Sequence, residues 1–404
     1  MGSPERPRSR SQRVTRPAIA GIALFVGSLA LRPQIVTIGP LAPSIANDLS
    51  VNHAFVGLLT TVPVLCMGIF APLGPLIAAR VGARRAMALG LLILGASALV
   101  RVTSSAAVPF LAATLGIGIG TGVSGPIPSI LTKLHAPERA AVVGGAASAG
   151  IIAGAVASAA SVVPVAEALG GWRPALALLA AVGLATTAGW FVLLGGDPLA
   201  SLALPARTPV WRLRSSWLLA LVFGLQATLY WGGTAWLAET YVERGWTEAA
   251  AGELIGLLQG SALAASIAVA AFSDRAGPRL MQIRMSAAGT LAAALGFVAL
   301  PSAAFAWTTI LGLSLGAIFP LLLIYPIDIS LTPARAGTLS GFMLLVGYTI
   351  AAVGPLGLGA VRDVSGGFQA TFGILAIVAT LLLITGSLVP RSHLPASSAT
   401  PSIG

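Results

Sequence analysis

Apolar stretches of about 20 residues, separated by short polar segments, dominate the sequence. A helix of this length spans the roughly 30 Å hydrocarbon core of a bilayer. These stretches are apolar nearly all round, and in lipid a helix satisfies its own backbone hydrogen bonds. We therefore predict twelve membrane-spanning helices, over residues 18–46, 54–79, 86–104, 107–132, 141–165, 174–195, 216–238, 253–273, 284–301, 305–327, 337–360 and 369–389.

The composition supports this class and excludes others. Of the 404 residues, 56% are hydrophobic and 9% charged, whereas an average soluble domain has roughly 25% charged residues. Disordered chains are also excluded, because they are poor in apolar residues. A single cysteine, Cys66, excludes a disulfide scaffold. The sequence thus predicts an all-α membrane protein in contact with a lipid bilayer.

The basic residues predict how the helices are oriented. The predicted loops and tails on the side of the N-terminus hold 18 Arg and Lys residues, against Arg101, Arg173, Arg244 and Arg362 on the other side. Basic residues favour the cytoplasmic side, and twelve spans place both termini there, so we expect a plasma-membrane protein with cytoplasmic termini. This bias explains the net charge of +11 without a nucleic-acid partner. A cleaved signal peptide is disfavoured, because the apolar run continues past Arg32.

An internal repeat divides the chain into two halves. Arg80-x-Gly82-x-Arg84 recurs 195 residues later as Arg275-x-Gly277-x-Arg279, and Gly170-Gly171 recurs as Gly366-Gly367 with nearly the same spacing. Such a repeat predicts two six-helix bundles. The predicted organisation is a basic tail at 1–17, a bundle at 18–195, a linker at 196–215, a second bundle at 216–389 and a tail at 390–404.

The repeated loops are candidates for holding one end state of the protein closed. Glycine permits a tight turn, while arginine can cap a helix C-terminus or pair with a carboxylate. Asp274 can supply that carboxylate in the second loop, whereas the first loop has Ala79 at this place. The candidate gating residues are Arg80, Gly82, Arg84, Arg85, Asp274, Arg275, Gly277 and Arg279.

These features resemble the major facilitator superfamily, through the twelve spans, the six-plus-six repeat and the Asp-Arg-x-Gly-x-Arg type loop. Within it, the chain resembles the cyanate and 2-nitroimidazole transporter family (CynX/NimT type). The matching residues are Leu31-Arg32-Pro33, Gly39-Pro40-Leu41, Thr61-Val62-Pro63-Val64, Arg80-Val81-Gly82, Val100-Arg101, Pro128, Lys133, Gly171-Trp172-Arg173, Trp236-Leu237 and Ala251-Gly252. The resemblance implies that spans one, four, seven and ten line a central cavity.

Arg32 is the one charged residue deep inside a predicted span. A charge there costs at least roughly 2.5–3.5 kcal/mol on insertion scales, so it is a functional candidate. The guanidinium is a planar fork of donors that suits a carboxylate, cyanate or nitro group. Two structural alternatives stay open: Arg32 bonds carbonyl groups freed by Pro33, or it extends toward the membrane surface.

A polar stripe on the seventh span gives a second candidate. Gln226, Tyr230 and Thr234 follow each other at four-residue spacing and so share one helix face. Hydrogen bonding between helices is the alternative role. Adding the repeat offset of 195 residues to position 32 gives Ala227, which is next to Gln226. Equivalent positions of the two repeats meet near the bilayer midplane, so we predict that Arg32 and this stripe lie together there. Further candidates for substrate contact are Ser124, Gln259 and Tyr325.

Together these observations predict a secondary active transporter. It would move a small anionic or polar solute, such as a cyanate-like anion, a nitroimidazole or a small organic anion, by alternating access. Every Asp, Glu and His lies in a loop or near a span end, so we expect no enzyme activity, metal or cofactor, and we expect a monomer. The alternative is a proton-coupled multidrug or metabolite efflux pump. Span five lacks the Gly-x-x-x-Gly-Pro type motif of such antiporters, because no proline precedes Pro164.

Overall fold

The computed structural model describes residues 10–51, 53–193, 209–365 and 368–389, and the regular elements in these ranges are helices. The N-terminal half contains α1 (Arg10–Leu29), α2 (Pro33–Val36), α3 (Ala42–Leu49), α4 (His53–Ile69), α5 (Leu73–Val81), α6 (Ala83–Thr103), α7 (Ala107–Ser124), α8 (Ile127–His135), α9 (Ala140–Ala168) and α10 (Trp172–Leu193). The C-terminal half contains α11 (Arg214–Glu243), α12 (Glu248–Phe272), α13 (Arg279–Ala299), α14 (Ala304–Ile329), α15 (Pro333–Ser365) and α16 (Phe368–Ser387).

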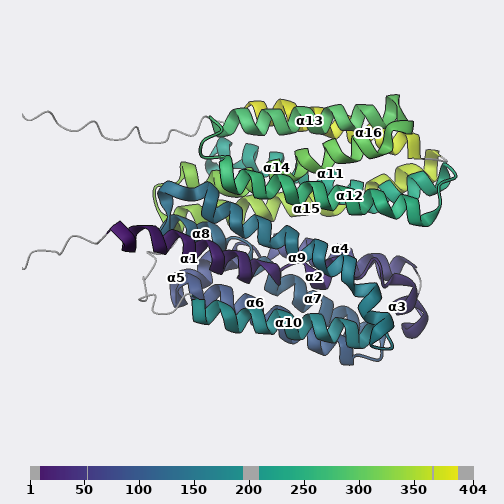
Figure 1. Cartoon of the computed structure of the whole chain (residues 1–404), viewed down its shortest axis with the longest axis horizontal. Helices are drawn as coiled ribbons and strands as arrows, with labels where there is room; N and C mark the ends of the chain where they lie inside the picture. The colour runs from purple at the N-terminus through teal and green to yellow at the C-terminus, as the bar shows by residue number, and fades with distance from the viewer. Residues whose placement is uncertain (1–9, 52, 194–208, 366–367, 390–404) are drawn as a thin grey trace, which may run out of the picture.

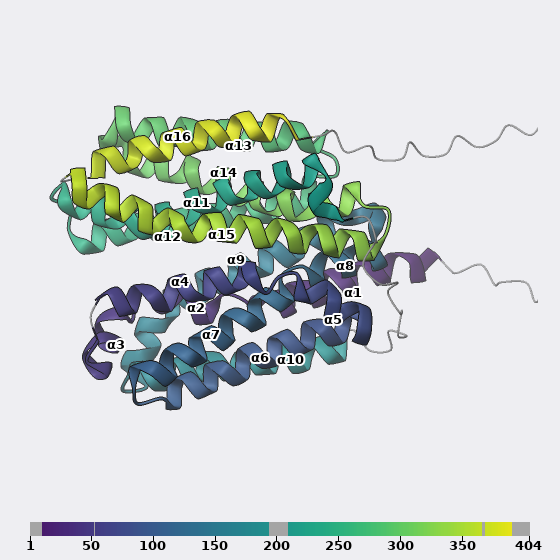
Figure 2. The ribbon, with the colours of Figure 1, turned by 180° about the vertical axis from the view of Figure 1, so that it is seen from behind.

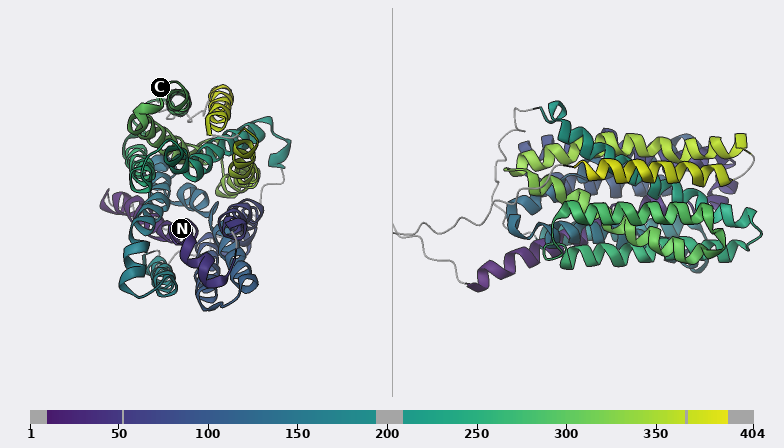
Figure 3. Two further views of the ribbon diagram at one scale, coloured as in Figure 1. Left: turned by 90° about the vertical axis from the view of Figure 1, so that its right-hand side faces the viewer. Right: turned by 90° about the horizontal axis from the view of Figure 1, so that it is seen from above.

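The two halves are separate helical layers that lie side by side, as Figure 1 shows in purple to teal and in green to yellow. They meet along equivalent helices of the repeat. In the interface α4 and α5 pack on α15, α9 packs on α12 and α14, and α8 packs on α14 and α15. Figure 3 shows the same two bundles viewed along their length. The six-plus-six repeat in the sequence therefore corresponds to two halves in space.

Ten helices among the described residues are long and apolar enough to cross a membrane. The bent pair α4 and α5, with an angle of 55° between its parts, makes eleven. The remaining predicted span, 174–195, overlaps α10, and its last two residues lie outside the described residues. The structure thus establishes a helical membrane protein with many spans. Eleven of the twelve predicted spans are identified among the described residues.

Helix breaks divide the first, second and fourth predicted spans. Each is interrupted, between α1 and α2, between α4 and α5, and between α7 and α8. At each break a proline, namely Pro33, Pro72 or Pro126, stands at or next to the start of the following helix. Proline lacks the N–H group that a continuous helix needs, and its ring collides with the preceding turn.

The first described helix starts, and the last one ends, at the same end of the bundle. Figure 2 shows the start of α1 and the end of α16 at one side, and Arg284 Nη2 at the start of α13 donates to the carbonyl oxygen of Ser387, 2.8 Å away. We call this the loop end, because it also carries the repeated turns. Gly82 and Gly277 have φ of +89° and +94° there, a conformation that favours glycine. The linker 196–215 lies largely outside the described residues.

Two glycines let α9 approach α1 closely just before the first break. A Cβ atom on Gly150 would lie 2.3 Å from the carbonyl oxygen of Phe25, and one on Gly154 would lie 2.1 Å from that of Leu29. Both distances are shorter than any real contact. Small residues at such interfaces let membrane helices pack backbone to backbone. This packing fixes the last turn of α1 and therefore the start of the break that follows it.

Replacing Gly154 by alanine should destabilise the protein by about 1–3 kcal/mol, the usual cost of forcing extra volume into a packed site. Gly256→Ala in α12 is the matched control, because a Cβ atom there meets nothing within 4 Å. Thermal unfolding of the two purified variants provides the measurement. Equal unfolding temperatures for both would contradict the proposed close contact.

Candidate functional site

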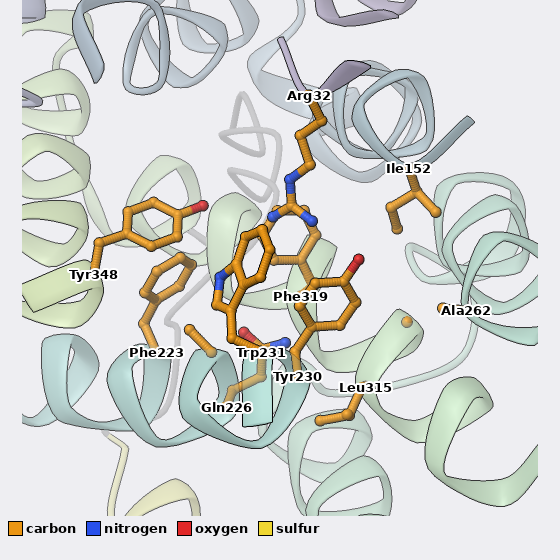
Figure 4. A pocket seen from close by; sticks show the side chains of 12 residues that line it. Arg32, Ile152, Phe223, Gln226, Tyr230, Trp231, Ala262, Leu315, Phe319 and Tyr348 are labelled. Atoms are coloured by element: carbon orange, nitrogen blue, oxygen red, sulfur yellow. The ribbon is translucent and has the colours of Figure 1, made fainter. Parts of the chain in front are cut away.

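Arg32 lies in the break between α1 and α2, at the centre of the interface between the two halves. It is the residue that precedes the short helix α2, and its side chain is only 4% exposed. The Thr121 hydroxyl of α7 lies 3.4 Å from the carbonyl oxygen of Leu31, beside the break. Figure 4 shows the guanidinium extending from the N-terminal half toward helices of the other half.

Aromatic rings from the C-terminal half surround this guanidinium. The Cζ atom of Arg32 lies 5.2 Å from the ring centroid of Tyr230, 5.3 Å from that of Trp231 and 5.2 Å from that of Phe319. The hydroxyl of Tyr348 in α15 points toward it from another side (Figure 4). Ring faces attract cations, more strongly where water is excluded, so these contacts compensate part of the burial cost.

Several polar atoms around this charge lack a partner. Arg32 Nε, Gln226 Oε1 and Trp231 Nε1 are buried without a hydrogen bond in the described part of the protein, and no described acidic side chain forms an ion pair with Arg32. All three residues line a small cavity with a volume of about 20 Å³. A buried cation with unpaired donors is suited to an anionic or electron-rich ligand.

The structure brings some of the predicted site residues together and not others. Gln226 and Tyr230 line the cavity with Arg32, as the repeat offset predicts. Gln259 stands behind Tyr230, whose hydroxyl donates to Gln259 Oε1 at 2.9 Å. Thr234 is not among the lining residues, and its hydroxyl donates to the carbonyl oxygen of Tyr230 one turn earlier, 2.8 Å away.

Ser124 and Tyr325 do not line this cavity either. Ser124 Oγ faces α6, because a Cβ atom on Gly90 would lie 2.2 Å from it. Tyr325 is 1% exposed in the part of α14 nearest the loop end. Both hydroxyl groups lack a hydrogen bond among the described residues. Their predicted contact with substrate has no support in this arrangement of the two halves.

Among the lining residues that were not predicted are three whose aromatic rings lie around Arg32, namely Trp231, Phe319 and Tyr348. Aromatic residues in a membrane span are ordinary, so their presence carries no distinctive pattern. A usable signal existed for two of them. Trp231 adjoins Tyr230, and Phe319 lies in the tenth span, which the family resemblance places at the cavity.

The second gating loop forms a polar cluster around Arg279. Its guanidinium donates to Ser273 Oγ at 2.5 Å, to Asp328 Oδ2 at 3.0 Å and to Asp274 Oδ1. The partnership of Arg279 with Asp274 agrees with the prediction, whereas Asp328, only 5% exposed at its side chain, was not predicted. Arg80, Arg85 and Arg275 are exposed. The Arg84 carbonyl oxygen accepts from Trp190 Nε1 at 3.2 Å.

Hydrogen bonds join the two halves near the loop end. Lys133 Nζ of α8 donates to the carbonyl oxygen of Ile327 in α14 at 3.0 Å. Nearby, the Ser340 hydroxyl of α15 donates to Ser129 Oγ at 2.9 Å. The lysine also complements the negative end of the α14 dipole. The two halves therefore contact each other on the loop side of the Arg32 cavity.

Two helical bundles, related by a repeat and meeting around a buried cavity, define the architecture of a secondary transporter. Residues 22–355 match the model of the Major Facilitator Superfamily, so the chain belongs to this family of membrane transporters and is not an enzyme. Among solved structures it resembles the human organic anion transporter MFSD10 (TETRAN), with a TM-score of 0.70, 19% identity, and 94% of this chain and 100% of that chain covered. The transporter FucP in the outward conformation gives a TM-score of 0.74 at 12% identity, covering 94% and 99% of the two chains.

Curated relatives match nearly the whole chain. A 2-nitroimidazole transporter of Escherichia coli (strain K12) is 31% identical over 382 residues, which cover 92% of this chain and 95% of that protein. The cyanate transport protein CynX of the same strain is 29% identical over 376 residues, covering 91% and 97%. The resemblance seen in the sequence motifs is therefore confirmed along the whole length.

Asp328→Asn should destabilise the protein by about 3 kcal/mol, because it leaves the buried Arg279 charge with only the more exposed Asp274 as an ionic partner. Asp274→Asn is the control and should cost less than about 1 kcal/mol, since that side chain is 34% exposed. Thermal unfolding in detergent measures both changes. Similar losses for the two variants would show that Asp328 has no special structural importance.

Proposed function

We propose that the protein moves a small anionic or polar solute across the plasma membrane by alternating access, with Arg32 holding the solute between the two halves. The single observation that carries this proposal is the buried guanidinium, which has aromatic neighbours but no ionic partner among the described residues. Cyanate-like anions, nitroimidazoles and small organic anions are the substrate classes we favour. The names of the two Escherichia coli relatives support this choice.

The electrostatics of the cavity favour an anion over a neutral solute. A guanidinium remains protonated at any physiological pH, so burial cannot be relieved by loss of the proton. A bound anion would supply the missing opposite charge and accept from Arg32 Nε and Trp231 Nε1, which lack acceptors. Gln226 and Tyr230 would then orient the solute against the aromatic faces. The small cavity favours a ligand of a few atoms.

We further propose twelve spans with both termini in the cytoplasm. The start of α1 and the end of α16 lie at one end of the bundle, which requires an even number of crossings. Counting α10 as a span, in addition to the eleven already identified, gives twelve. The excess of basic residues in the loops at the loop end supports the orientation.

In this proposal, the contacts at the loop end break and reform during transport. Lys133 and Ser129 on α8 hold helices of the opposite half, and they would separate when the cavity opens to the cytoplasm. The breaks beside Pro33, Pro72 and Pro126 lie in three of the helices that must move. Interrupted helices supply hinges in transporters that rock around a midplane site.

The alternative of a proton-coupled efflux pump has less support. A proton-coupled site needs a titratable carboxylate or imidazole near the solute. The residues that line the Arg32 cavity include no Asp, Glu or His. Asp328 is buried, but it pairs with Arg279 near the loop end rather than facing the cavity. We therefore favour exchange, or a proton carried by the substrate itself.

Arg32→Ala and Arg32→Lys should both abolish uptake, or reduce it at least about tenfold, because neither keeps the planar fork of donors. The assay is uptake of labelled cyanate, 2-nitroimidazole and a panel of small organic anions into proteoliposomes. Circular dichroism and thermal unfolding check that both variants fold. Normal transport by folded Arg32→Ala would overturn the proposed site.

Trp231→Phe should raise the KM for transported anions about tenfold or more, since it keeps an aromatic ring but removes the indole N–H. Because this N–H has no partner among the described residues, the folded protein should lose little stability. Trp307→Phe is the control, because Trp307 does not line the cavity and its indole donates to the carbonyl oxygen of Leu300, 2.9 Å away. An unchanged KM in Trp231→Phe would remove the indole from the proposed binding site.

A further inference from the structure

Arg101 is a second buried arginine, and the proposed binding site does not use it directly. It lies in the last turn of α6 and is 0% exposed, although its sequence position suggested an external loop. No described acidic side chain forms an ion pair with it. The Arg101 guanidinium instead contacts a single residue of α2 through two hydrogen bonds, and it lies 5.7 Å from the ring centroid of Phe110.

That residue is Gln34, two positions after Arg32. Arg101 Nη1 donates to the Gln34 carbonyl oxygen at 2.9 Å, and Nη2 donates to Gln34 Oε1 at 2.6 Å. Hydrogen bonds from a charged donor are stronger than neutral ones, and a pair from one planar fork also fixes the orientation of the acceptor. Arg101 therefore holds both the backbone and the side chain of α2.

The helix α2 needs such support because it has only four residues. A helix of one turn is not stable alone, since forming the first turn orders several residues for few hydrogen bonds. The other side-chain hydrogen bonds between this segment and neighbouring helices are longer. The Gln34 amide lies 3.5 Å from the carbonyl oxygen of Leu176, and the Thr121 hydroxyl lies 3.4 Å from that of Leu31. Among the described residues, the two bonds from Arg101 are the shortest side-chain hydrogen bonds between this segment and another helix.

The end of α6 that carries Arg101 is itself anchored. Arg173 at the start of α10 donates to the carbonyl oxygens of Val102 and Ser104, at 2.9 Å and 2.7 Å. Its guanidinium also pairs with Asp48 at 2.7 Å and stacks over the ring of Trp172. The chain of contacts thus runs from the end of the bundle opposite the loop end, through α6, to the segment that bears Arg32.

We propose that Arg101 is a positioning residue: it fixes α2 through Gln34, so that the break before α2 presents the Arg32 guanidinium to the cavity. The inference rests on the proposed function only in that Arg32 holds the solute. The position of α2 can be tested without any solute, and the effect on transport can then be tested separately.

The first experiment measures hydrogen–deuterium exchange of the solute-free protein in detergent. The reporting amides are those of Leu31, Ile35, Val36 and Thr37: the first donates to the carbonyl oxygen of Ser28 in α1, and the other three donate to those of Arg32 and Pro33. Arg101→Met should speed their exchange about tenfold, while amides in the middle of α6 and α10 keep their wild-type rates. Arg362→Met is the matched control, because Arg362 pairs with Glu243 in the other half. Unchanged exchange at 31–37 in Arg101→Met overturns the inference.

The second experiment measures proteoliposome uptake of labelled cyanate and 2-nitroimidazole. Arg101→Met should raise KM about tenfold with a smaller change in kcat, because the carrier still cycles but holds Arg32 poorly. Gln34→Glu should retain wild-type KM, since its carboxylate can accept the bond from Arg101 Nη2 and the backbone carbonyl at position 34 still accepts the bond from Nη1. Arg101→Lys should be impaired alone and improved by Gln34→Glu. An unchanged KM in Arg101→Met overturns the positioning role. A fall in kcat as large as the rise in KM, together with no improvement of Arg101→Lys by Gln34→Glu, also overturns it.

The outcomes separate this inference from the proposed function. If folded Arg32→Ala transports normally, the proposed site fails whatever Arg101 does. If Arg32→Ala is inactive and Arg101→Met is normal, only the role of Arg101 fails. If wild-type protein moves neither probe, cyanate-like anions and nitroimidazoles fail as substrate classes, and the exchange rates of residues 31–37 alone decide whether Arg101 holds α2.

Discussion

A single permanent charge buried in an apolar interior constrains much of this structure. The Arg32 guanidinium cannot lose its proton, and no described carboxylate pairs with it. The surroundings compensate in part with three aromatic faces. They also leave donors and acceptors unpaired, so a site of this kind is incomplete without a ligand. The residues that supply the rings belong to the half opposite the one that supplies the charge, and the cavity exists only where both halves meet.

The position of that charge depends on helices that stop and restart. Pro33 ends the continuity of the first span, and the two glycines of α9 let the last turn of α1 approach closely before the break. On the other side, Arg101 holds Gln34. A continuous helix would direct residue 32 along one fixed face. The break allows the Arg32 side chain to extend across the interface. It also leaves backbone polar groups without a helical partner, and other helices must supply their hydrogen bonds.

Hydropathy and the repeat predicted most of the fold and the meeting of three polar residues at the candidate site. Arg32, Gln226 and Tyr230 stood out because polar residues inside apolar spans are rare, and the repeat offset brought them together. Thr234 shares their helix face, but its hydroxyl bonds its own backbone, which spacing cannot reveal. Trp231, Phe319 and Tyr348 were missed because an aromatic residue in a span has no distinguishing pattern. Arg101 was assigned to a loop, because the sequence alone does not distinguish a charged residue buried at the end of a span from one in the loop that follows.

The uncompensated guanidinium also has an electrical consequence. An empty central site has a net charge of +1 from Arg32, whereas the same site holding a monoanion is neutral. Moving one full charge across the membrane requires electrical work of about 2.3 kcal/mol per 100 mV of membrane potential. When the site changes its access from one side of the membrane to the other, its charge crosses some fraction of that potential. The loaded and empty steps of the cycle therefore differ in electrical work. With the monoanionic substrate we propose, membrane voltage would act mainly on the return of the empty carrier, and exchange of one monoanion for another would be insensitive to it.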